Sequence, residues 1–339
     1  MSKRTACALT LAFLSLPALA QQDAPAPPAQ QAVDAPEAVP AQIVVAGKRP
    51  GPGLWKVSKG DHVMWVFGLY SPLPQKMEWD DARVARLVAQ SQEVLGVPTV
   101  SVGTGYLGML TALPNMIGMK KMPDGAQLRD VVPADVYARW QTLKTKYIGA
   151  DDGIERYRPM FAADELMDAA LKRNGMVRSI QVRKQIETLA KKNDVKFTDP
   201  GVHVMVDNPG STLKEFKKSQ VDDAACFTKT LERFEGDMDA TRRRANAWAD
   251  GNIAEIGNLD YAEREDACAD AVMNSTLARN NPALQNMRER RFNAWIKAVE
   301  SALDRNKATF AMLPMNEIVG PKSYLAALQA RGYTVESPK

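Results

Sequence analysis

GLWKVSKGDHVMWVFG, residues 53–68, contains two apolar runs, at 54–57 and 63–67, with a polar turn between them. Short runs rich in Val, Trp and Phe and bounded by Gly and Asp are typical of β-strands, so a strand is predicted at 63–67. The same criteria predict short strands elsewhere in the chain, at 99–102, 195–197, 202–206, 309–313 and 333–335.

Helical spacing fills most of the remaining sequence. Asp80 or Asp81 can cap a helix that carries Val84, Leu87, Val88 and Leu95 on one side, and Pro133 opens another with Val136, Trp140, Leu143 and Tyr147. One or two long helices are expected over 211–251, and a last long helix from 281 to about 306. Strands separated by helices predict an α/β fold, with α+β as the alternative, in which many helices wrap a small central sheet.

The composition is that of a chain able to bury a core. Of 339 residues, 45% are hydrophobic and 25% charged, and the formal charge of +4 is too small to indicate nucleic-acid binding. The sequence contains 2 histidines, His62 and His203, and neither has a His or Cys within a helical turn. A zinc-type site built on these imidazoles is therefore not expected.

The first residues have the features of an export signal. Lys3 and Arg4 precede an apolar segment, and the small residues 18–20 end in a cleavage site after Ala20. The division expected is a signal peptide at 1–20, a disordered linker rich in Pro and Ala at 21–52, and one folded domain at 53–339. The prediction is a periplasmic or secreted protein without a membrane span.

Cleavage would remove Cys7 and leave Cys226 and Cys268 in an oxidising compartment. An even pair of cysteines there predicts a disulfide, although two buried free thiols are the alternative. A bridge between residues 42 positions apart would stabilise the fold by about 4 kcal/mol on the loop-entropy model.

Arg291 is conspicuous by its position in the last predicted long helix. It falls on the stripe formed by Leu284, Met287, Ala294, Ala298 and Ala302, which should face the interior. A guanidinium there extends to the edge, forms an ion pair, or lines an anion-binding cleft.

Several segments together resemble the TraB/GumN family, which includes the Tiki-type membrane peptidases. The opening stretch 53–68 is similar to the start of that family, and Ala247–Asn252 to its AWxxGD segment with Asn252 in place of the acid. Residues 279–282 resemble its RNPxL segment, and 308–312 with 325–335 its closing strand, helix and strand. The resemblance covers about 53–335 and implies a metalloprotease-like fold.

The resemblance also locates the family's proposed metal chemistry, two GxxH motifs that each follow a strand. The first aligns on Gly68 to Ser71, so serine replaces histidine; the second aligns on Pro314 to Glu317, so proline and glutamate replace glycine and histidine. An acid expected on the helix after the first motif has only Glu93 as a candidate. Arg291 matches the arginine of the family's Arg-Asn pair, in which Phe292 replaces the asparagine.

Serine is a poor ligand for zinc or cobalt, and one glutamate cannot hold such an ion well. We therefore expect no confident catalytic residue, no metal and no cofactor, but a cleft formed by Gly68, Ser71, Arg291, Pro314 and Glu317. The function predicted is an exported pseudoenzyme that acts as a binding or accessory module toward an unknown ligand or protein partner. The alternative is a working hydrolase or peptidase, either with a hard ion on Glu317 or without metal.

Overall fold

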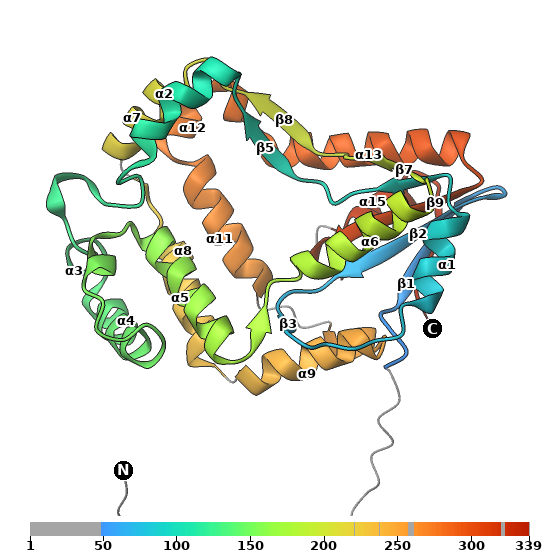
Figure 1. The fold of residues 1–339 in the computed structure, drawn as a ribbon, viewed down its shortest axis with the longest axis horizontal. Helices are drawn as coiled ribbons and strands as arrows, with labels where there is room; N and C mark the ends of the chain where they lie inside the picture. Colours follow the sequence, from blue (N-terminus) through green and yellow to red (C-terminus); the bar gives the residue numbers. More distant parts are fainter. Residues whose placement is uncertain (1–48, 220, 237, 257–260, 320–322, 339) are drawn as a thin grey trace, which may run out of the picture. The chain divides into compact units, whose positions relative to one another are not determined.

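The computed structural model describes residues 49–219, 221–236, 238–256, 261–319 and 323–338 (Figure 1). Its main sheet has, in this part of the chain, six strands. Their order is β10 (Thr334–Glu336), β1 (Leu54–Lys59), β2 (His62–Leu69), β9 (Ala308–Pro314), β4 (Glu93–Leu95) and β7 (Lys196–Thr198). The pairs from β2 to β7 are parallel, whereas β1 pairs antiparallel with both β2 and β10. Two small sheets join β3 (Leu73–Pro74) to β6 (Met176–Val177), and β5 (Val100–Gly103) to β8 (Val202–Met205).

Helices make up most of the rest. Those packed against the sheet or against one another around it are α1 (Ala82–Gln90), α6 (Ile180–Lys192), α13 (Met287–Arg305), α14 (Met315–Val319) and α15 (Tyr324–Ala330). A second group packs together beyond them in Figure 1: α4 (Ala134–Tyr147), α5 (Pro159–Arg173), α8 (Ala224–Glu235) and α11 (Tyr261–Met273). The others are α2 (Tyr106–Met116), α3 (Leu128–Val131), α7 (Pro209–Lys218), α9 (Met238–Ala249), α10 (Ile253–Ile256) and α12 (Thr276–Asn280), with 3-10 turns at Pro123–Gly125, Gly153–Arg156 and Pro282–Leu284.

The opening stretch forms a hairpin within the main sheet, between β10 and β9. Gly60 has φ of +59°, the left-handed conformation that glycine adopts without strain, and turns β1 into β2. Phe67, at the end of β2, packs against Trp79, Trp248 and Phe310 with ring centroids 5.9 to 6.1 Å apart. Fully burying such rings stabilises the fold by about 1.5–3 kcal/mol each, so these aromatic contacts fix the end of β2 in the core.

The α/β prediction is confirmed, and the six predicted strands are present within a residue or two. Three helix predictions are wrong in detail. The first helix ends at Gln90, and Leu95 lies on β4. The region 211–251 contains α7, α8 and α9 rather than one or two helices. The last long helix, α13, begins only at Met287, because Asn286 adopts a left-handed conformation with φ of 54°. Leu284 therefore lies in a preceding 3-10 turn and not on the stripe of α13.

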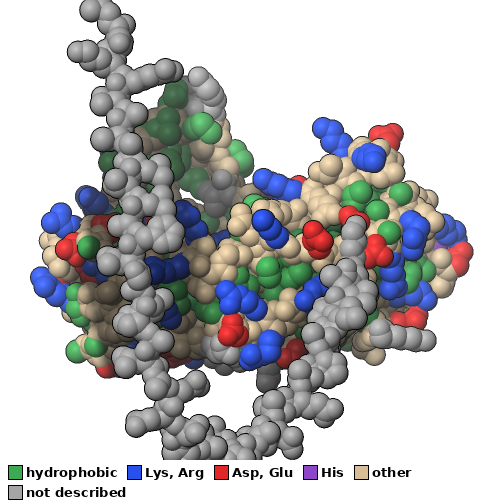
Figure 2. Space-filling view, turned by 60° about the horizontal axis from the view of Figure 1, so that its bottom comes forward, with side chains coloured by type: hydrophobic (Ala, Val, Ile, Leu, Met, Phe, Trp, Pro, Cys, Tyr) green, Lys and Arg blue, Asp and Glu red, His purple; other side chains and the backbone are tan. Residues whose placement is uncertain are grey.

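The predicted signal peptide and all of the predicted linker before Arg49 lie outside the described residues, so this division stays a prediction. Among the described residues no helix is long and apolar enough to cross a bilayer. The face shown in Figure 2 carries basic and acidic side chains in mixture, with apolar groups between them.

Candidate functional site

The two altered motifs meet because of the sheet topology. β2 and β9 are parallel neighbours, with Gly68 opposite Leu313 and Leu69 opposite Pro314. The chain leaves both strands at the same edge, where Ser71 follows β2 and Glu317 lies in α14 directly after β9. Ligands of open α/β sheets bind outside the carboxyl ends of parallel strands, so this edge is the natural place for a site.

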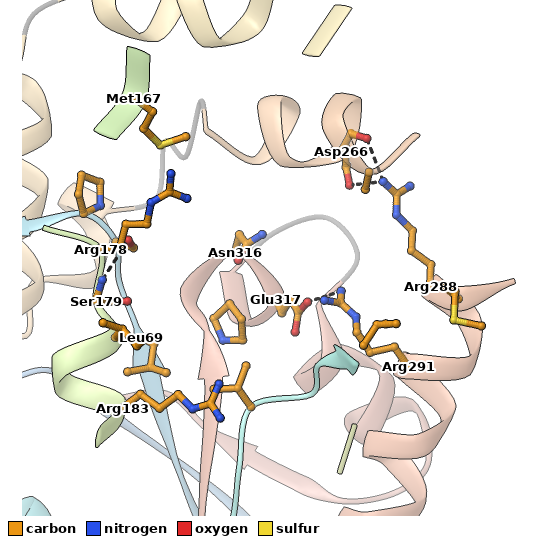
Figure 3. Close-up of a pocket in the computed structure, with 18 of the residues that line it drawn as sticks. Leu69, Met167, Arg178, Ser179, Arg183, Asp266, Arg288, Arg291, Asn316 and Glu317 are labelled. Atoms are coloured by element: carbon orange, nitrogen blue, oxygen red, sulfur yellow. Dashed lines mark hydrogen bonds and ion pairs between the residues drawn. The ribbon is translucent and has the colours of Figure 1, made fainter. Parts of the chain in front are cut away.

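A cavity of about 520 Å³ lies at this edge. Strand ends supply one wall and helices α5, α6, α8, α11 and α13 supply the other, as Figure 3 shows for the labelled side chains. The polar and charged lining residues are Ser71, Arg178, Ser179, Arg183, Arg233, Asp266, Arg288, Arg291, Asn316 and Glu317. The apolar ones are Leu69, Pro72, Val97, Val100, Met167, Leu171, Ile180, Ala269, Met273, Met287 and Pro314.

Four of the five residues expected in the cleft, Ser71, Arg291, Pro314 and Glu317, line this cavity. The fifth, Gly68, does not. A Cβ on Gly68 would come within 2.9 Å of Met315 Cε, and its carbonyl accepts a hydrogen bond of 2.7 Å from Trp248 Nε1. Gly68 therefore allows β2 to pack closely against α14, and the segment similar to AWxxGD holds the end of β2 through Trp248.

Glu317 is a buried residue of the cavity lining. Its Oε1 accepts a hydrogen bond from the guanidinium of Arg291 (Figure 3), whereas its Oε2 is buried without a hydrogen-bond partner among the described residues. Burial raises the pKa of Glu317 to about 7, and the charge of Arg291 opposes this rise. Near neutral pH both protonation states of this carboxyl group are therefore populated.

Arg291 combines two of the three roles open to it, an ion pair and the lining of a cleft. Tyr324 lies on its other side, and burial beside Glu317 raises the pKa of Tyr324 to about 12. Phe292, in place of the family's asparagine, packs edge-on against the ring of Tyr324 at 4.9 Å. The missing asparagine is thus replaced by an apolar contact that fixes α13 against α15.

Ser71 interacts with the start of a helix rather than with an ion. Its Oγ accepts a hydrogen bond of 3.3 Å from the backbone N–H of Ser179, which precedes the first residue of α6. This contact ties the loop after β2 to the helical wall of the cavity.

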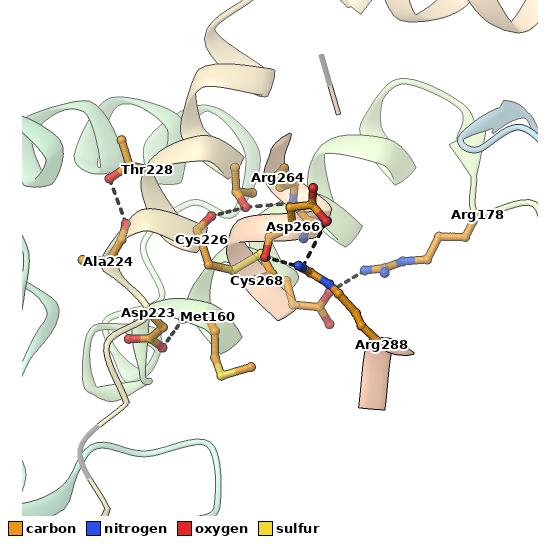
Figure 4. The surroundings of a disulfide bond; sticks show 12 residues. Met160, Arg178, Asp223, Ala224, Cys226, Thr228, Arg264, Asp266, Cys268 and Arg288 are labelled. Atoms are coloured by element: carbon orange, nitrogen blue, oxygen red, sulfur yellow. Dashed lines mark hydrogen bonds and ion pairs between the residues drawn. A yellow bond between two sulfur atoms is a disulfide. The ribbon is translucent and has the colours of Figure 1, made fainter. Parts of the chain in front are cut away.

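The disulfide fixes that helical wall. Cys226 of α8 is bonded to Cys268 of α11, as expected from the sequence (Figure 4). Asp266, Ala269 and Met273 of α11 line the cavity, and Asp266 forms an ion pair of 3.0 Å with Arg288 of α13. The bond thus holds α11 where it closes the cavity, and it fits an oxidising compartment.

The donor groups do not fit a borderline divalent metal ion. The described residues contain no group of three or more His, Cys, Asp and Glu side chains that could hold one. In the cavity the acid that replaces the motif histidine already accepts from a guanidinium, and a dication beside Arg291 would be repelled. His62 begins β2 at the end opposite to Ser71, and His203 lies on β8 beside Ser101 and Asp199.

Glu93 belongs to a different environment. It starts β4 instead of lying on a helix, and it does not line the cavity. Its buried carboxylate accepts hydrogen bonds from Thr198 and Asn306 and pairs with Lys196. Burial opposes its ionisation, but these partners prevail and lower the pKa of Glu93 to about 2, so this acid stabilises the sheet.

The sequence reasoning missed the arginines of the helical wall, Arg178, Arg183, Arg233 and Arg288. Each lies on a different segment from the family motifs, so motif alignment gave no reason to select it. One signal was present: Arg178 and Arg183 stand at the start of a predicted helical region, where acidic residues are the usual choice.

The fold and cavity define a mixed α/β protein with a pocket at the carboxyl ends of parallel strands. A model of the TraB/PrgY/gumN family matches residues 53–337, so the chain belongs to this family. No curated protein and no solved structure gives a significant match.

Proposed function

We propose that this protein is an exported member of the TraB/PrgY/gumN family that acts as a binding or accessory module without the metal-dependent hydrolase chemistry attributed to the family. The observation that carries the proposal is the state of Glu317. This residue takes the place of the second motif histidine, and it is buried in an ion pair with Arg291 instead of being available to an ion.

Export is supported by the disulfide and by the signal-like sequence at 1–20. Binding is supported by the cavity volume of about 520 Å³, which lies in the range of small-molecule sites of roughly 300–1,000 Å³. The mixture of arginines and apolar side chains in its lining offers contacts to both parts of an amphipathic ligand.

The test is metal content together with hydrolysis. The purified protein is dialysed against Mn²⁺ or Co²⁺, its bound metal is measured by mass spectrometry, and a peptide library is incubated with it. We expect much less than one ion per chain and no cleavage. About one ion per chain that is lost on Glu317→Ala, with cleavage that follows it, would overturn the proposal.

A second candidate is a hydrolase that needs no metal. It is favoured by the Oε2 of Glu317, which has no partner among the described residues and belongs to a group with a pKa of about 7, suited to general base catalysis. Glu317→Gln separates the two candidates, because it would abolish hydrolysis but not binding. Cleavage by the wild type in the presence of a chelator that disappears in Glu317→Gln would establish the second candidate.

A further inference from the structure

The helical wall carries cationic side chains where a helix normally has acidic ones. Arg178 precedes Ser179, the residue that caps α6, and Arg183 lies in the first turn, which contains no acid. The N-terminus of a helix bears partial positive charge and itself attracts anions, and the two arginines, although each is paired with acids outside the cavity, add donors at the same place. We propose that the cavity binds an organic anion with an apolar body and that its anionic group lies at the N-terminus of α6, between Arg178 and Arg183.

This inference rests on the proposed function as a binding protein and names the class of its ligand. The charge of the lining supports it: 5 lining side chains are arginines, against the two acids Asp266 and Glu317. Arginine suits the recognition of carboxylate and phosphate because its planar group donates two parallel hydrogen bonds.

The two arginines at the start of α6 keep donors available. Arg178 uses Nε and one terminal nitrogen for Asp164 and Asp168, and Arg183 uses Nε for Glu187. Among the described residues, the other terminal nitrogen of Arg178 and both terminal nitrogens of Arg183 have no acceptor. Because Asp164, Asp168 and Glu187 do not line the cavity, they orient the guanidinium groups without occupying the ligand's place.

The rest of the cavity suits an apolar body. Leu69, Val97, Met167, Leu171 and Met287 line it, and a free phosphate ion would leave this surface and most of the 520 Å³ unused. Glu317, an acid of the same lining, is nine-tenths buried and neutralised by Arg291, so it does not repel an anion elsewhere in the cavity. An amphipathic anion satisfies both groups of side chains at once.

The test compares four ligands of one chain length by titration calorimetry below their micelle concentrations. Decanoate and decyl phosphate carry an anion, 1-decanol is neutral and decyltrimethylammonium is cationic. We expect decanoate or decyl phosphate to bind about tenfold or more tightly than decanol, and the tighter of the two identifies the anionic group. The double variant Arg178→Gln/Arg183→Gln should weaken binding of the anion about tenfold or more and leave decanol unchanged.

The matched control is Arg173→Gln, an exposed arginine of α5 that does not line the cavity, and it should bind decanoate as the wild type does. The arginine double variant should fold, because the side chains of Arg178 and Arg183 are both partly exposed, and thermal unfolding checks this. Decanol binding as tightly as both anions, or an unaffected double variant, would overturn the inference while leaving a binding function. Metal-dependent cleavage with selective anion binding would overturn the proposed function alone.

Discussion

The two walls of the cavity are held in different ways. The strand wall, at the ends of β2 and β9, is fixed by a continuous parallel ladder and by buried aromatic rings. The helical wall depends on one disulfide and on ion pairs whose members are mostly half exposed. The altered family motifs lie on the strand wall, whereas most of the arginines that we propose to select a ligand lie on the helical wall.

Breaking the strand wall should have the largest effect on stability. Trp248 is fully buried, donates to the carbonyl of Gly68 and packs on Phe67. Trp248→Ala should lower the free energy of unfolding by about 3–5 kcal/mol, measured by urea denaturation. Trp248→Phe retains most of the ring and loses the hydrogen bond, so it should lose about 1–3 kcal/mol. Equal losses in the two variants would contradict the assigned contacts.

Opening the helical wall should lower the free energy of unfolding somewhat less than Trp248→Ala does, but it should weaken ligand binding more. Replacing Cys226 and Cys268 by alanine should lower the free energy of unfolding by about 2–4 kcal/mol. It should also weaken decanoate binding several-fold, because α11 and its pair Asp266 with Arg288 lose their anchor. A reductant should reproduce both effects in the wild type and change nothing in the double variant. Full affinity after reduction would show that the disulfide does not support the cavity.

Glu317, which joins the two walls, should make stability depend on pH. The unfolded chain releases its proton near the ordinary pKa of 4.5, whereas the folded protein keeps it until about 7. Between these values the folded state binds more protons, so the free energy of unfolding falls as pH rises, by about 3 kcal/mol at most. Below pH 4.5 this stabilisation is complete.

Urea denaturation at several pH values measures this slope. Glu317→Gln removes it, so the stability of the variant relative to the wild type should increase from pH 4.5 to 7. Glu289→Gln, an exposed acid at the start of the same α13 that carries Arg291, is the control and should keep the wild-type slope. A wild-type slope in Glu317→Gln would exclude the carboxyl group as its source.

The smallest effect is expected at Ser71, where the walls touch through one hydrogen bond. This bond of 3.3 Å is long, so Ser71→Ala should lower the free energy of unfolding by less than about 1 kcal/mol. Thermal unfolding would detect the change, and a loss comparable to that of Trp248→Ala would show that Ser71 has a larger structural role than this contact.

The strand wall could be predicted from sequence because its determinants are local. The apolar runs at 63–67 and 309–313 predict β2 and β9, and the altered motifs follow these strands directly. The error at Leu95 has a tertiary cause. Val94 and Leu95 continue the apolar spacing of α1, but Glu93 pairs with Lys196 and Asn306, which lie far along the chain, and the segment forms a strand.

The helical wall could not be predicted in the same way. Arg178 and Arg183 are more than 100 positions from both motif segments, and nothing local shows that α6 would place them beside Ser71 and Glu317. Arg291 was identified because helical periodicity placed it on an inward stripe, although its partner Glu317 follows from the sheet topology and not from spacing.

The most direct test of the account is a pair of calorimetric titrations of one protein sample, with decanoate and with Mn²⁺. We expect one decanoate to bind per chain, with weaker binding in Arg178→Gln/Arg183→Gln, and no heat of specific binding for Mn²⁺. Stoichiometric binding of Mn²⁺ that is lost in Glu317→Ala, with no binding of decanoate, would contradict it.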